Sequence, residues 1–307
     1  MKLKKIRNAL LVVLTLALVS ATTVALTWAY VNKTLTEAEN TFTNNENIAL
    51  DITEPDWDGE IKEGKEYTPA NNYNPGDAVT TGITKGKNDG KTLADSYYPG
   101  LDIPKDPRIT NISNPTTTDN AVKAASQEII GANLQFIVKD GATEYAYPSY
   151  DAFKKNIATV KYSASKTPGY NATWAKFSDD DDLNLYFTKT VGWKGQTDHI
   201  FDWVTINPVN SEDVGAGKTY TTLNDVPVDD VDGIYTDGTN YSVKVYDKTL
   251  NNGAGGYKRI QLTKLPDFDI KIKGYAVQSQ PFGLEDGASI ASNDDAKNAL
   301  KSLMGLS

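Results

Sequence analysis

The sequence predicts an all-β fold in which antiparallel strands form a sandwich. Two observations lead to this prediction. Apolar and polar residues alternate with a period of two, which marks a strand with one buried face, and polar turns rich in Gly and Asn separate the alternating runs. Six runs show this pattern: Ile48–Ile52, Leu134–Val138, Leu183–Val191, Ile200–Ile206, Tyr241–Tyr246 and Phe268–Val277.

Three dipeptides between these runs predict tight hairpin turns. They are Asp140-Gly141, Asp237-Gly238 and Asn252-Gly253. Their residues tolerate the positive φ that such turns require. We therefore expect neighbouring strands to be antiparallel at these places.

Helical patterns are a minority and occur at three places. Thr118–Ile130 has apolar residues at helical spacing, and Ser149 is placed to cap a short helix that runs through Ile157. The tail from Ser292 resembles a capping box, with Asp295 three residues on, and continues as an apolar stripe. We expect this C-terminal helix to pack on the sandwich or on a neighbouring molecule.

The chain divides into four predicted segments: 1–29, 30–45, 46–291 and 292–307. The sandwich occupies 46–291 and the helical tail follows it. Within the sandwich, 54–104 is rich in Gly, Pro, Asn and Lys and has almost no apolar periodicity. This predicts a long surface loop, of a kind that is usually functional or poorly ordered.

The first thirty residues have the composition of an export signal. Lys2, Lys4, Lys5 and Arg7 precede an uncharged run, 8–32, whose first half is almost continuously apolar. A basic end followed by an apolar core is typical of a secretory signal peptide. Small-x-Ala sites place the cut after Ala21, Ala25 or Ala29. The alternative is an uncleaved membrane anchor, because the uncharged run is about as long as the ~20 residues that span a bilayer.

Removal of 1–29 leaves a strongly acidic chain. The sequence has 31 basic and 40 acidic residues, and the signal holds four of the basic ones, so the remaining chain has a net charge of about −13. Such an excess repels nucleic acid and anionic lipid. We therefore expect no nucleic-acid partner, and contact with a membrane only through the uncleaved signal.

The chain contains no cysteine. An exported protein without disulfides must obtain its stability from a core of adequate size. The length of the sequence allows such a core. The lack of cysteine fits a Gram-positive bacterium better than a eukaryotic secretory pathway.

Several short strings, taken in order, resemble one family of exported proteins. They are Thr27-Trp28-Ala29, Asn40-Thr41-Phe42-Thr43, Glu54-Pro55-Asp56-Trp57-Asp58, Pro99-Gly100, Lys105-Asp106-Pro107-Arg108-Ile109-Thr110-Asn111 and Tyr275-Ala276-Val277-Gln278. Their order and spacing are similar to those of proteins processed by the SipW type of signal peptidase, the group that contains TasA, camelysin and the BsaA-like biofilm matrix proteins. The resemblance is thin between Asn114 and Lys189. It marks as a family motif Asn40, Phe42, Glu54, Trp57, Lys105, Asp106, Pro107, Asn111, Ala276 and Gln278.

The resemblance implies a jelly-roll-like sandwich secreted to the extracellular matrix or cell surface, where family members assemble into fibres of the biofilm matrix. It also implies two partners: further copies of the same chain, and a SipW-type signal peptidase that cuts after Thr27-Trp28-Ala29 and leaves Tyr30 as the first residue. In TasA-like fibres the segment freed by this cut becomes a donor strand that completes the sheet of the next subunit. That segment corresponds here to 30–40. Insertions around 60–97 and 114–130 depart from the shorter family members.

The residues that follow the predicted cut suit a donor strand. An exposed sheet edge offers unpaired N–H and C=O groups that a strand of another chain satisfies. In an extended segment starting at Tyr30, the side chains of Val31, Lys33 and Leu35 lie on one face, and Thr and Val favour extended backbone. Because such a contact is head-to-tail, it generates a filament. The alternatives are a disordered leader or the protein's own first strand.

The central string of the motif also has a purely structural interpretation. Pro104 and Pro107 hold the residues before them away from the helical region. Because proline donates no hydrogen bond, a strand entered here is expected at a sheet edge. We expect this string to position a strand and to have no catalytic use.

The composition argues against a catalytic centre. The chain has one histidine, His199, and no His-Glu-x-x-His string, whereas zinc hydrolases generally use two or three His or Cys with a carboxylate. A serine triad would need His199 as its base, and no Gly-x-Ser-x-Gly elbow supplies the nucleophile. We therefore interpret His199 as a residue that leads from a loop into a strand.

Two acidic clusters and the aromatic residues leave alternatives open. The clusters are 179–182 and the group Asp225, Asp229, Asp230, Asp232 and Asp237. They are interpreted as solvated turn acids, and calcium binding is the alternative, although neither has EF-hand spacing. Trp174, Trp193 and Trp203 are interpreted as core residues, with a glycan platform as the alternative if two aromatic side chains prove exposed side by side.

The sequence therefore predicts a secreted structural protein that forms or joins extracellular fibres by strand exchange, without catalytic residues, metal or cofactor. A monomeric surface adhesin or binding module, stabilised by calcium if the acids bind it, is the alternative. A metalloprotease is the third hypothesis.

Overall fold

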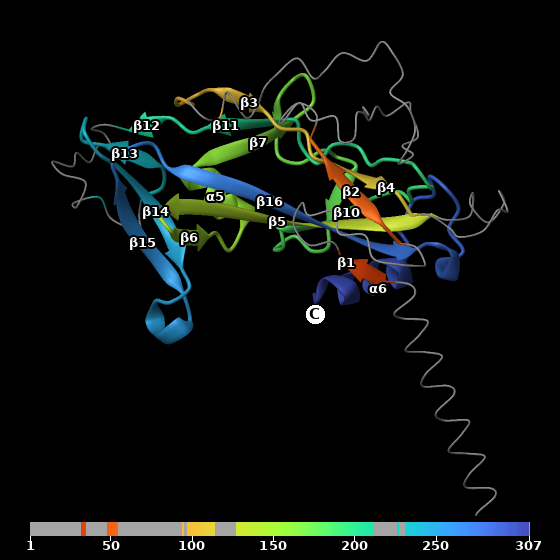
Figure 1. The fold of residues 1–307 in the computed structure, drawn as a ribbon. Helices are drawn as coiled ribbons and strands as arrows, with labels where there is room; N and C mark the ends of the chain where they lie inside the picture. The colour runs from red at the N-terminus through yellow and green to blue at the C-terminus, as the bar shows by residue number, and fades with distance from the viewer. Residues whose placement is uncertain are drawn as a thin grey trace, which may run out of the picture.

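The computed structural model describes residues 48–54, 97–113, 127–210 and 231–306, together with Ala94, Val226 and the backbone of 32–34. Within these residues strands predominate, and their sheets form an all-β sandwich, which confirms the predicted fold class. Figure 1 shows two layers of strands along the molecule, a further sheet at one end and a helix beneath the first layer at the other. The predicted signal lies outside the described residues.

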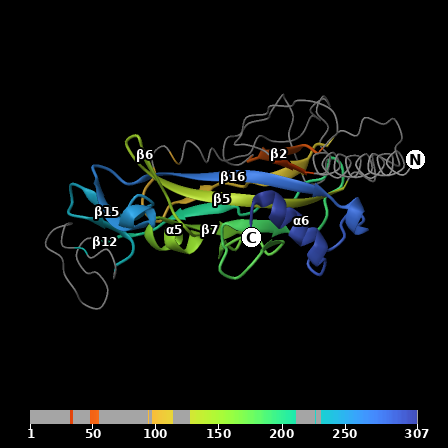
Figure 2. The same ribbon diagram turned by 90° about the horizontal axis from the view of Figure 1, so that it is seen from below.

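The first layer is built on two long antiparallel strands. β16 (Asp267–Gln278) pairs along its whole length with β5 (Glu128–Asp140). The order of the sheet is β1-β16-β5-β10-β9, and β6 forms a hairpin with β5. The other members are β1 (Asn32–Thr34), β6 (Thr143–Ala146), β9 (Trp174–Lys176) and β10 (Asn184–Phe187). β16 and β5 run along most of the sandwich, as Figure 2 shows.

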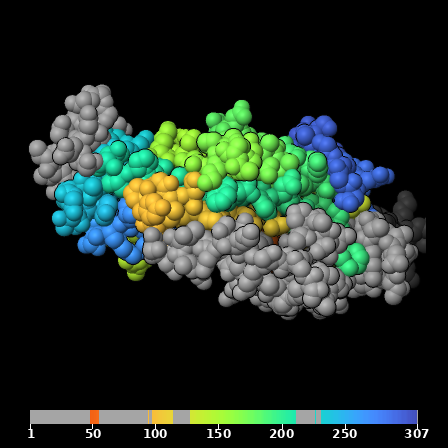
Figure 3. Space-filling model, turned by 90° about the horizontal axis from the view of Figure 1, so that it is seen from above, coloured from red at the N-terminus to blue at the C-terminus, as the bar shows by residue number. Residues whose placement is uncertain are grey.

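The second layer faces the first across the core. Its order is β3-β11-β7-β8, with β3 (Asp102–Pro104), β7 (Ala158–Tyr162), β8 (Thr167–Pro168) and β11 (Trp203–Ile206). In the space-filling view of Figure 3, the orange segment that contains β3 lies at the surface of the molecule. Inward side chains of both layers, such as Val160 and Phe136, belong to one buried apolar cluster. The alternating pattern of the sequence therefore points its apolar face into this cluster.

A short ribbon of two strands packs on the first layer. β2 (Leu50–Thr53) and β4 (Arg108–Asn111) are antiparallel, and we call them the β2–β4 ribbon. A Cβ added to Gly274 of β16 would lie 3.4 Å from side-chain atoms of both Leu50 and Ile109. The bare backbone at Gly274 therefore lets the ribbon approach β16 closely.

A four-stranded sheet forms one end of the molecule. It contains β12 (Val209–Asn210), β13 (Ile234–Thr236), β14 (Tyr241–Asp247) and β15 (Gly256–Leu262) in that order. β12 is parallel to β13, which the prediction of an antiparallel sheet missed, while the other pairs are antiparallel. The predicted turn at Gly238, with φ +90°, joins β13 to β14, and η3 (Asn251–Gly253) lies in the predicted turn between β14 and β15.

Aromatic side chains fill the centre of the sandwich. Phe136 of β5 stacks on Phe153 of α5 (Tyr150–Asn156), with ring centroids 4.7 Å apart. Ser149 caps α5 as predicted, because its Oγ accepts a hydrogen bond from Ala152 N at 3.1 Å. The cap fixes where the helix begins and so directs Phe153 into the core.

The C-terminal helix α6 (Asp294–Met304) packs beneath the first layer. The sequence predicted its start at Ser292, but Asn293 is the cap, and its Oδ1 accepts a hydrogen bond from Ala296 N at 3.0 Å. Leu300 is fully buried in a second apolar cluster that includes Tyr275 and Val277 of β16. A Cβ on Gly131 would lie 3.1 Å from Leu300 Cδ2, so β5 is bare where α6 crosses it.

Two predictions of local structure were wrong. Glu128–Ile130 was predicted to end a helix, but it begins β5, because its backbone pairs with β16. Asp102–Pro104, expected to be loop, forms the edge strand β3. In both cases pairing with a distant strand decides the backbone conformation. The remainder of the predicted helix and most of the predicted loop lie outside the described residues.

Candidate functional site

The first strand of the chain lies at an edge of the first layer. β1 pairs antiparallel with the end of β16, with Asn32 opposite Val277, Lys33 opposite Ala276 and Thr34 opposite Tyr275. Among the described strands, β16 is its only ladder partner. The predicted donor residue Lys33 is therefore placed in the chain's own sheet, whereas Tyr30, Val31 and Leu35 lie outside the described residues.

The two faces of this edge rest on different elements. Tyr275 and Val277 belong to the apolar cluster under α6, while Ala276 belongs to the main core. Because side chains alternate across a strand, Tyr275 and Val277 face α6, while Ala276 between them faces the main core. β16 thus offers β1 an edge that is supported from both faces.

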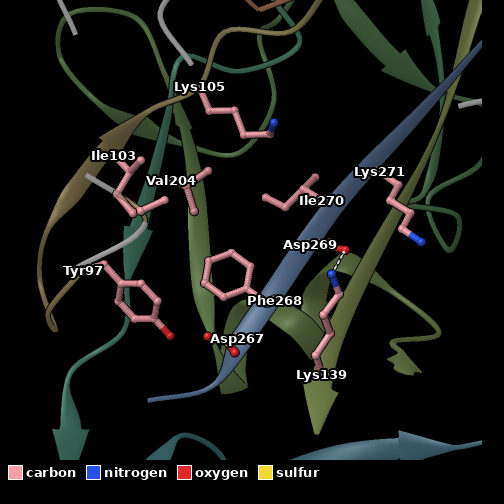
Figure 4. A pocket seen from close by; sticks show the side chains of 11 residues that line it. Tyr97, Ile103, Lys105, Lys139, Val204, Asp267, Phe268, Asp269, Ile270 and Lys271 are labelled. Atoms are coloured by element: carbon pink, nitrogen blue, oxygen red, sulfur yellow. Dashed lines mark ion pairs between the residues drawn. The ribbon is translucent and has the colours of Figure 1, made fainter. Parts of the chain in front are cut away.

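A groove lies beside the other part of β16. None of the described strands pairs with this side of β16 between Asp267 and Gly274. Here a cavity of about 450 Å³ opens between β3 and β16. Figure 4 shows apolar side chains from both strands around it, among them Ile103 and Phe268. The Tyr97 ring meets Phe268 edge-on at 6.0 Å, and burial raises the pKa of its phenol.

The lysines that line the groove are paired with acids. The Nζ atoms of Lys105, Lys139 and Lys271 lie 2.6 Å from Glu54 Oε2, 2.5 Å from Asp269 Oδ2 and 3.5 Å from Glu144 Oε2, respectively. The positive charges at the rim of the groove are therefore largely neutralised, while the floor of the groove is apolar. This chemistry suits apolar side chains better than an ionic ligand.

Residues of the motif that the sequence resemblance predicts, although far apart in the sequence, meet at the β2–β4 ribbon. Glu54, directly after β2, forms its ion pair with Lys105, which directly follows β3 and lies three residues before the start of β4. The carbonyl of Pro107 accepts a hydrogen bond from Ile200 N at 2.8 Å. Asp106 is buried, and its Oδ2 lies 3.4 Å from Arg108 Nη2. The central string therefore holds the ribbon in place, as its structural interpretation expected.

Asn111 and Glu128 form the interior of the same region. Asn111 Nδ2 donates to Val191 O at 3.0 Å, and its Oδ1 accepts from Ser113 N at 3.0 Å. Ser113 Oγ in turn lies 3.2 Å from Glu128 Oε1. Sequence reasoning missed Glu128, because the helical spacing around it concealed a buried carboxyl in a strand.

The motif residues of the last string lie in β16. Ala276 is fully buried opposite Lys33, and Gln278 pairs with Glu128. The structure thus brings Glu54, Lys105, Asp106, Pro107, Asn111, Ala276 and Gln278 to the ribbon and to the end of β16 on which it packs. The motif residues Asn40, Phe42 and Trp57, and the predicted cleavage residues Thr27 and Ala29, lie outside the described part of the chain.

His199 is part of a small polar cluster. Its Nδ1 lies 2.6 Å from Asp202 Oδ1, and its Nε2 lies 3.7 Å from Asp106 Oδ2. Burial alone would raise the pKa of Asp202, but hydrogen bonds from His199 and Ser163 N outweigh it and lower the pKa. Ile200 and Phe201, which follow His199, are fully buried, but the strand that His199 was predicted to enter, β11, begins only at Trp203.

Four acids of the two predicted clusters cap backbone groups or pair with lysine. Asp182 accepts hydrogen bonds from Tyr150 N and Asp151 N, both at 2.8 Å, at the start of α5. Asp181 binds the backbone N–H of Leu183 and Asn184. Across the described residues, no group of three or more His, Asp or Glu side chains is arranged to hold a metal ion. Asp225, Asp229 and Asp230 lie outside those residues, whereas Asp232 pairs with Lys244 and Asp237 caps its own turn.

The predicted core tryptophans have different environments. Trp174 is buried, and its indole N–H donates to Asp198 O at 3.0 Å. Trp193 and Trp203 instead lie beneath the amines of Lys194 and Lys166 at 4.1 and 4.5 Å. The core interpretation therefore holds fully for Trp174 alone.

One aromatic pair is partly exposed. Tyr246 and Tyr257 are opposite each other on β14 and β15, with ring centroids 5.3 Å apart and planes at 72°. Tyr257 is 39% exposed. The edge-on arrangement gives a polar, aromatic surface, but not the flat platform on which a sugar ring stacks.

Comparison with known proteins adds no relative. No family model matches the chain, and neither the curated proteins nor the solved structures include a significant match. Of the helices that the structure describes, none is long and apolar enough to cross a membrane.

Proposed function

We propose that this chain is a secreted structural protein that forms or joins extracellular biofilm matrix fibres by head-to-tail donor-strand exchange. One observation supports the proposal most: the first strand is a three-residue edge strand that is attached to the sheet through β16. Such a strand forms few bonds to its own molecule. The identical strand of a second molecule is able to form the same bonds.

Strand exchange between two molecules keeps every backbone pair that β1 forms with β16. In the closed monomer, Lys33 pairs with Ala276 of the same chain, and in a fibre it would pair with Ala276 of the next chain. Because the bonds are the same, the balance between the two states depends on concentration and on the strain of the connection after β1. Swapping an identical element is a low-cost route to assembly, and a head-to-tail swap that does not close gives a filament.

Signal cleavage supplies the trigger in this proposal. Before a SipW-type peptidase cuts between Ala29 and Tyr30, the first strand is continuous with the membrane-inserted signal and cannot enter a neighbour. After the cut its N-terminus is free. The secreted protein would then assemble outside the cell or on its surface.

The register of β1 limits the acceptor to the end of β16. Continued beyond Thr34, which is opposite Tyr275, an antiparallel donor would set Leu35 opposite Gly274 and Glu37 opposite Ile272. Opposed residues share a face, and Ile272 faces the core, so the short carboxylate side chain of Glu37 would have to be buried there, whereas the long stem of a lysine at a sheet edge lets its amine reach solvent. Burying an unpaired carboxylate is costly. We therefore assign the acceptor segment, which pairs with the donor strand, to Tyr275–Val277. The groove beside β3 is not part of it.

Engineered cysteines test the exchange directly, because the natural chain has none. The secreted form is prepared with Lys33→Cys alone, with Ala276→Cys alone, and with both. Residues opposite each other in antiparallel strands have the spacing that a disulfide requires. When the two single variants are mixed under oxidising conditions, a mixed disulfide dimer should appear on SDS gels. In the control mixture, Lys258→Cys replaces Ala276→Cys, and no such dimer should appear.

The double variant gives the second arm of this test. Oxidised as a dilute monomer, it should lock the first strand in its own sheet and form no filaments by electron microscopy, and reduction should restore them. If filaments form equally well while the lock is closed, or if the mixed singles never cross-link, strand exchange at this edge is wrong.

A binding module remains the second proposal, favoured by the partly exposed pair Tyr246 and Tyr257. Under it, the secreted protein would stay monomeric in analytical ultracentrifugation at the concentrations where the first proposal expects filaments, and Tyr257→Ala would not change this. The strand-exchange proposal expects no effect of Tyr257→Ala on filaments.

A further inference from the structure

Glu128 is a carboxyl group sealed inside the protein. It is the first residue of β5 and has no exposed surface. Its backbone is held on two sides, by pairing with Gln278 of β16 and by two hydrogen bonds with Val191, at 2.9 and 2.8 Å. The side chain therefore cannot leave the interior unless a neighbouring element moves.

The element in front of the carboxyl is the β2–β4 ribbon. Ser113 Oγ, just after β4, lies 3.2 Å from Glu128 Oε1 and accepts a hydrogen bond from Ala49 N, just before β2, at 3.1 Å. Glu128 Oε2 has no hydrogen-bond partner among the described residues. One hydroxyl group thus links the carboxyl to both strands at one end of the ribbon, and we call Glu128, Ser113 and Ala49 the clasp.

Among the residues that the structure describes, the groups that face Glu128 carry no compensating charge. From the ribbon, Ser113 is the only side chain that acts on its ionisation. Asp51 and Arg108 lie on the opposite face of the ribbon, since they alternate with the inward residues Leu50 and Ile109. On the segment that contains Val191, the Lys194 amine lies over Trp193, and Asp286 packs against Gly192. On β16, Lys273 alternates with the inward Ile272 and Gly274.

An uncompensated buried carboxyl resists ionisation. Burial raises the pKa of Glu128 to about 8, against which the hydrogen bond from Ser113 acts only weakly. In solvent the ordinary pKa is 4.5. Between these values the closed structure keeps a proton that an opened structure would release, so raising the pH favours opening.

We propose that Glu128 makes the β2–β4 ribbon a pH-operated element: protonated Glu128 keeps the clasp closed, and its ionisation releases the ribbon from β5 and β16. The ribbon is the element that yields, because in the described part of the chain Ser113 Oγ is the only hydrogen-bond partner of the Glu128 side chain, whereas ladder bonds hold the Glu128 backbone. Opening the clasp admits water to the carboxylate. The proposal does not depend on fibre formation.

Amide hydrogen exchange measures the opening. The reporters are the amides of Ala49, Ile112 and Ser113, which donate to Ser113 Oγ, Ala49 O and Asn111 Oδ1. Exchange of the full secreted chain is followed from pH 5 to pH 8 and corrected for the intrinsic rate. Because each opening would release one proton, protection at these amides should fall about tenfold per pH unit.

Two variants give the matched comparison. Glu128→Gln keeps the shape but cannot ionise, so protection at the reporters should be independent of pH. Glu144→Gln removes the same charge from a half-exposed site on β6 and should keep the wild-type slope.

The wild-type slope decides the question even if Glu128→Gln does not fold. Corrected protection that is flat between pH 5 and pH 8 in the wild type would overturn the proposal. So would a Glu128→Gln protein that loses protection as steeply as the wild type. A slope near tenfold per unit in wild type and Glu144→Gln, together with a flat or unfolded Glu128→Gln, supports it.

Discussion

Replacing Leu300 with alanine tests how α6 is held on the sandwich. Leu300 is fully buried, and it packs over Gly131 at the place where β5 lacks a side chain. The change removes three carbon atoms, worth about 2.4 kcal/mol at ~0.8 kcal/mol for each buried methylene. The cavity that remains adds to this loss, and buried Leu→Ala changes cost roughly 2–5 kcal/mol in all. We expect a loss of about 3 kcal/mol in the free energy that docks α6.

The loss should appear first as local opening of α6. An isolated helix shorter than about 12 residues is marginal in water, and α6 has 11 residues. The helix will therefore unfold when it leaves the sheet, and its amides will exchange about 100-fold faster for a 3 kcal/mol loss, since ~1.4 kcal/mol corresponds to a factor of ten. Protection in β14 and β15, at the other end of the molecule, should not change.

Amide exchange by mass spectrometry, resolved to the peptide that contains α6, is the assay. Ser302→Ala is the control, because Ser302 is exposed on the same helix and alanine favours helix. If Leu300→Ala exchanges at the same rate as Ser302→Ala, then α6 does not depend on this cluster and the assignment of its docking face is wrong.

Two further predictions concern single carboxylates. Asp182→Ala should destabilise the protein by about 1–3 kcal/mol, because the N–H groups of Tyr150 and Asp151 at the start of α5 lose their acceptor. Asp180→Ala, on the exposed part of the same acidic run, should change the stability by no more than about 0.5 kcal/mol. A melting temperature that falls when a chelator is added would instead favour calcium binding. For Asp102, burial alone would raise the pKa, but hydrogen bonds led by that from Lys166 lower it to about 2 from 3.8. This depressed pKa stabilises the folded protein above pH 3.8, and the stabilisation is lost as the pH falls towards 2. After a discount for solvent screening, we expect the free energy of unfolding to fall by about 1 kcal/mol between pH 5 and pH 2.5. Urea titrations at the two pH values measure this loss, and Asp102→Asn should not show it.

Local patterns predicted much of the fold but not its connections. Period-two alternation located β5, β14 and β16, and the Asp-Gly and Asn-Gly dipeptides located turns between strands. The same approach failed at Glu128, where apolar residues at helical spacing precede a strand, because the spacing of a short run does not decide between helix and strand. It failed again at β3, whose three residues pair with β11 across about a hundred positions of sequence.

The candidate site was only partly accessible to sequence reasoning. The strings that contain Glu54, Lys105 and Ala276 were recognised as a set, and the structure brings them to one region. Nothing in the strings indicated that Asn111 and Ser113 close over a buried Glu128. A carboxyl group on a strand is read as solvent-facing unless the position of its partner strand is known.

The sequence by itself determined the elements whose causes are local. These are the strands with one apolar face, the turns with a positive φ, the cap at Ser149, and the absence of cysteine and of a His-rich metal set. Tertiary structure alone decided which strands became neighbours, that the first strand occupies the edge of β16, and that Glu128 is enclosed. The physical reason is that alternation states which face of a strand is buried, whereas pairing and burial arise from contacts between residues that the chain separates widely.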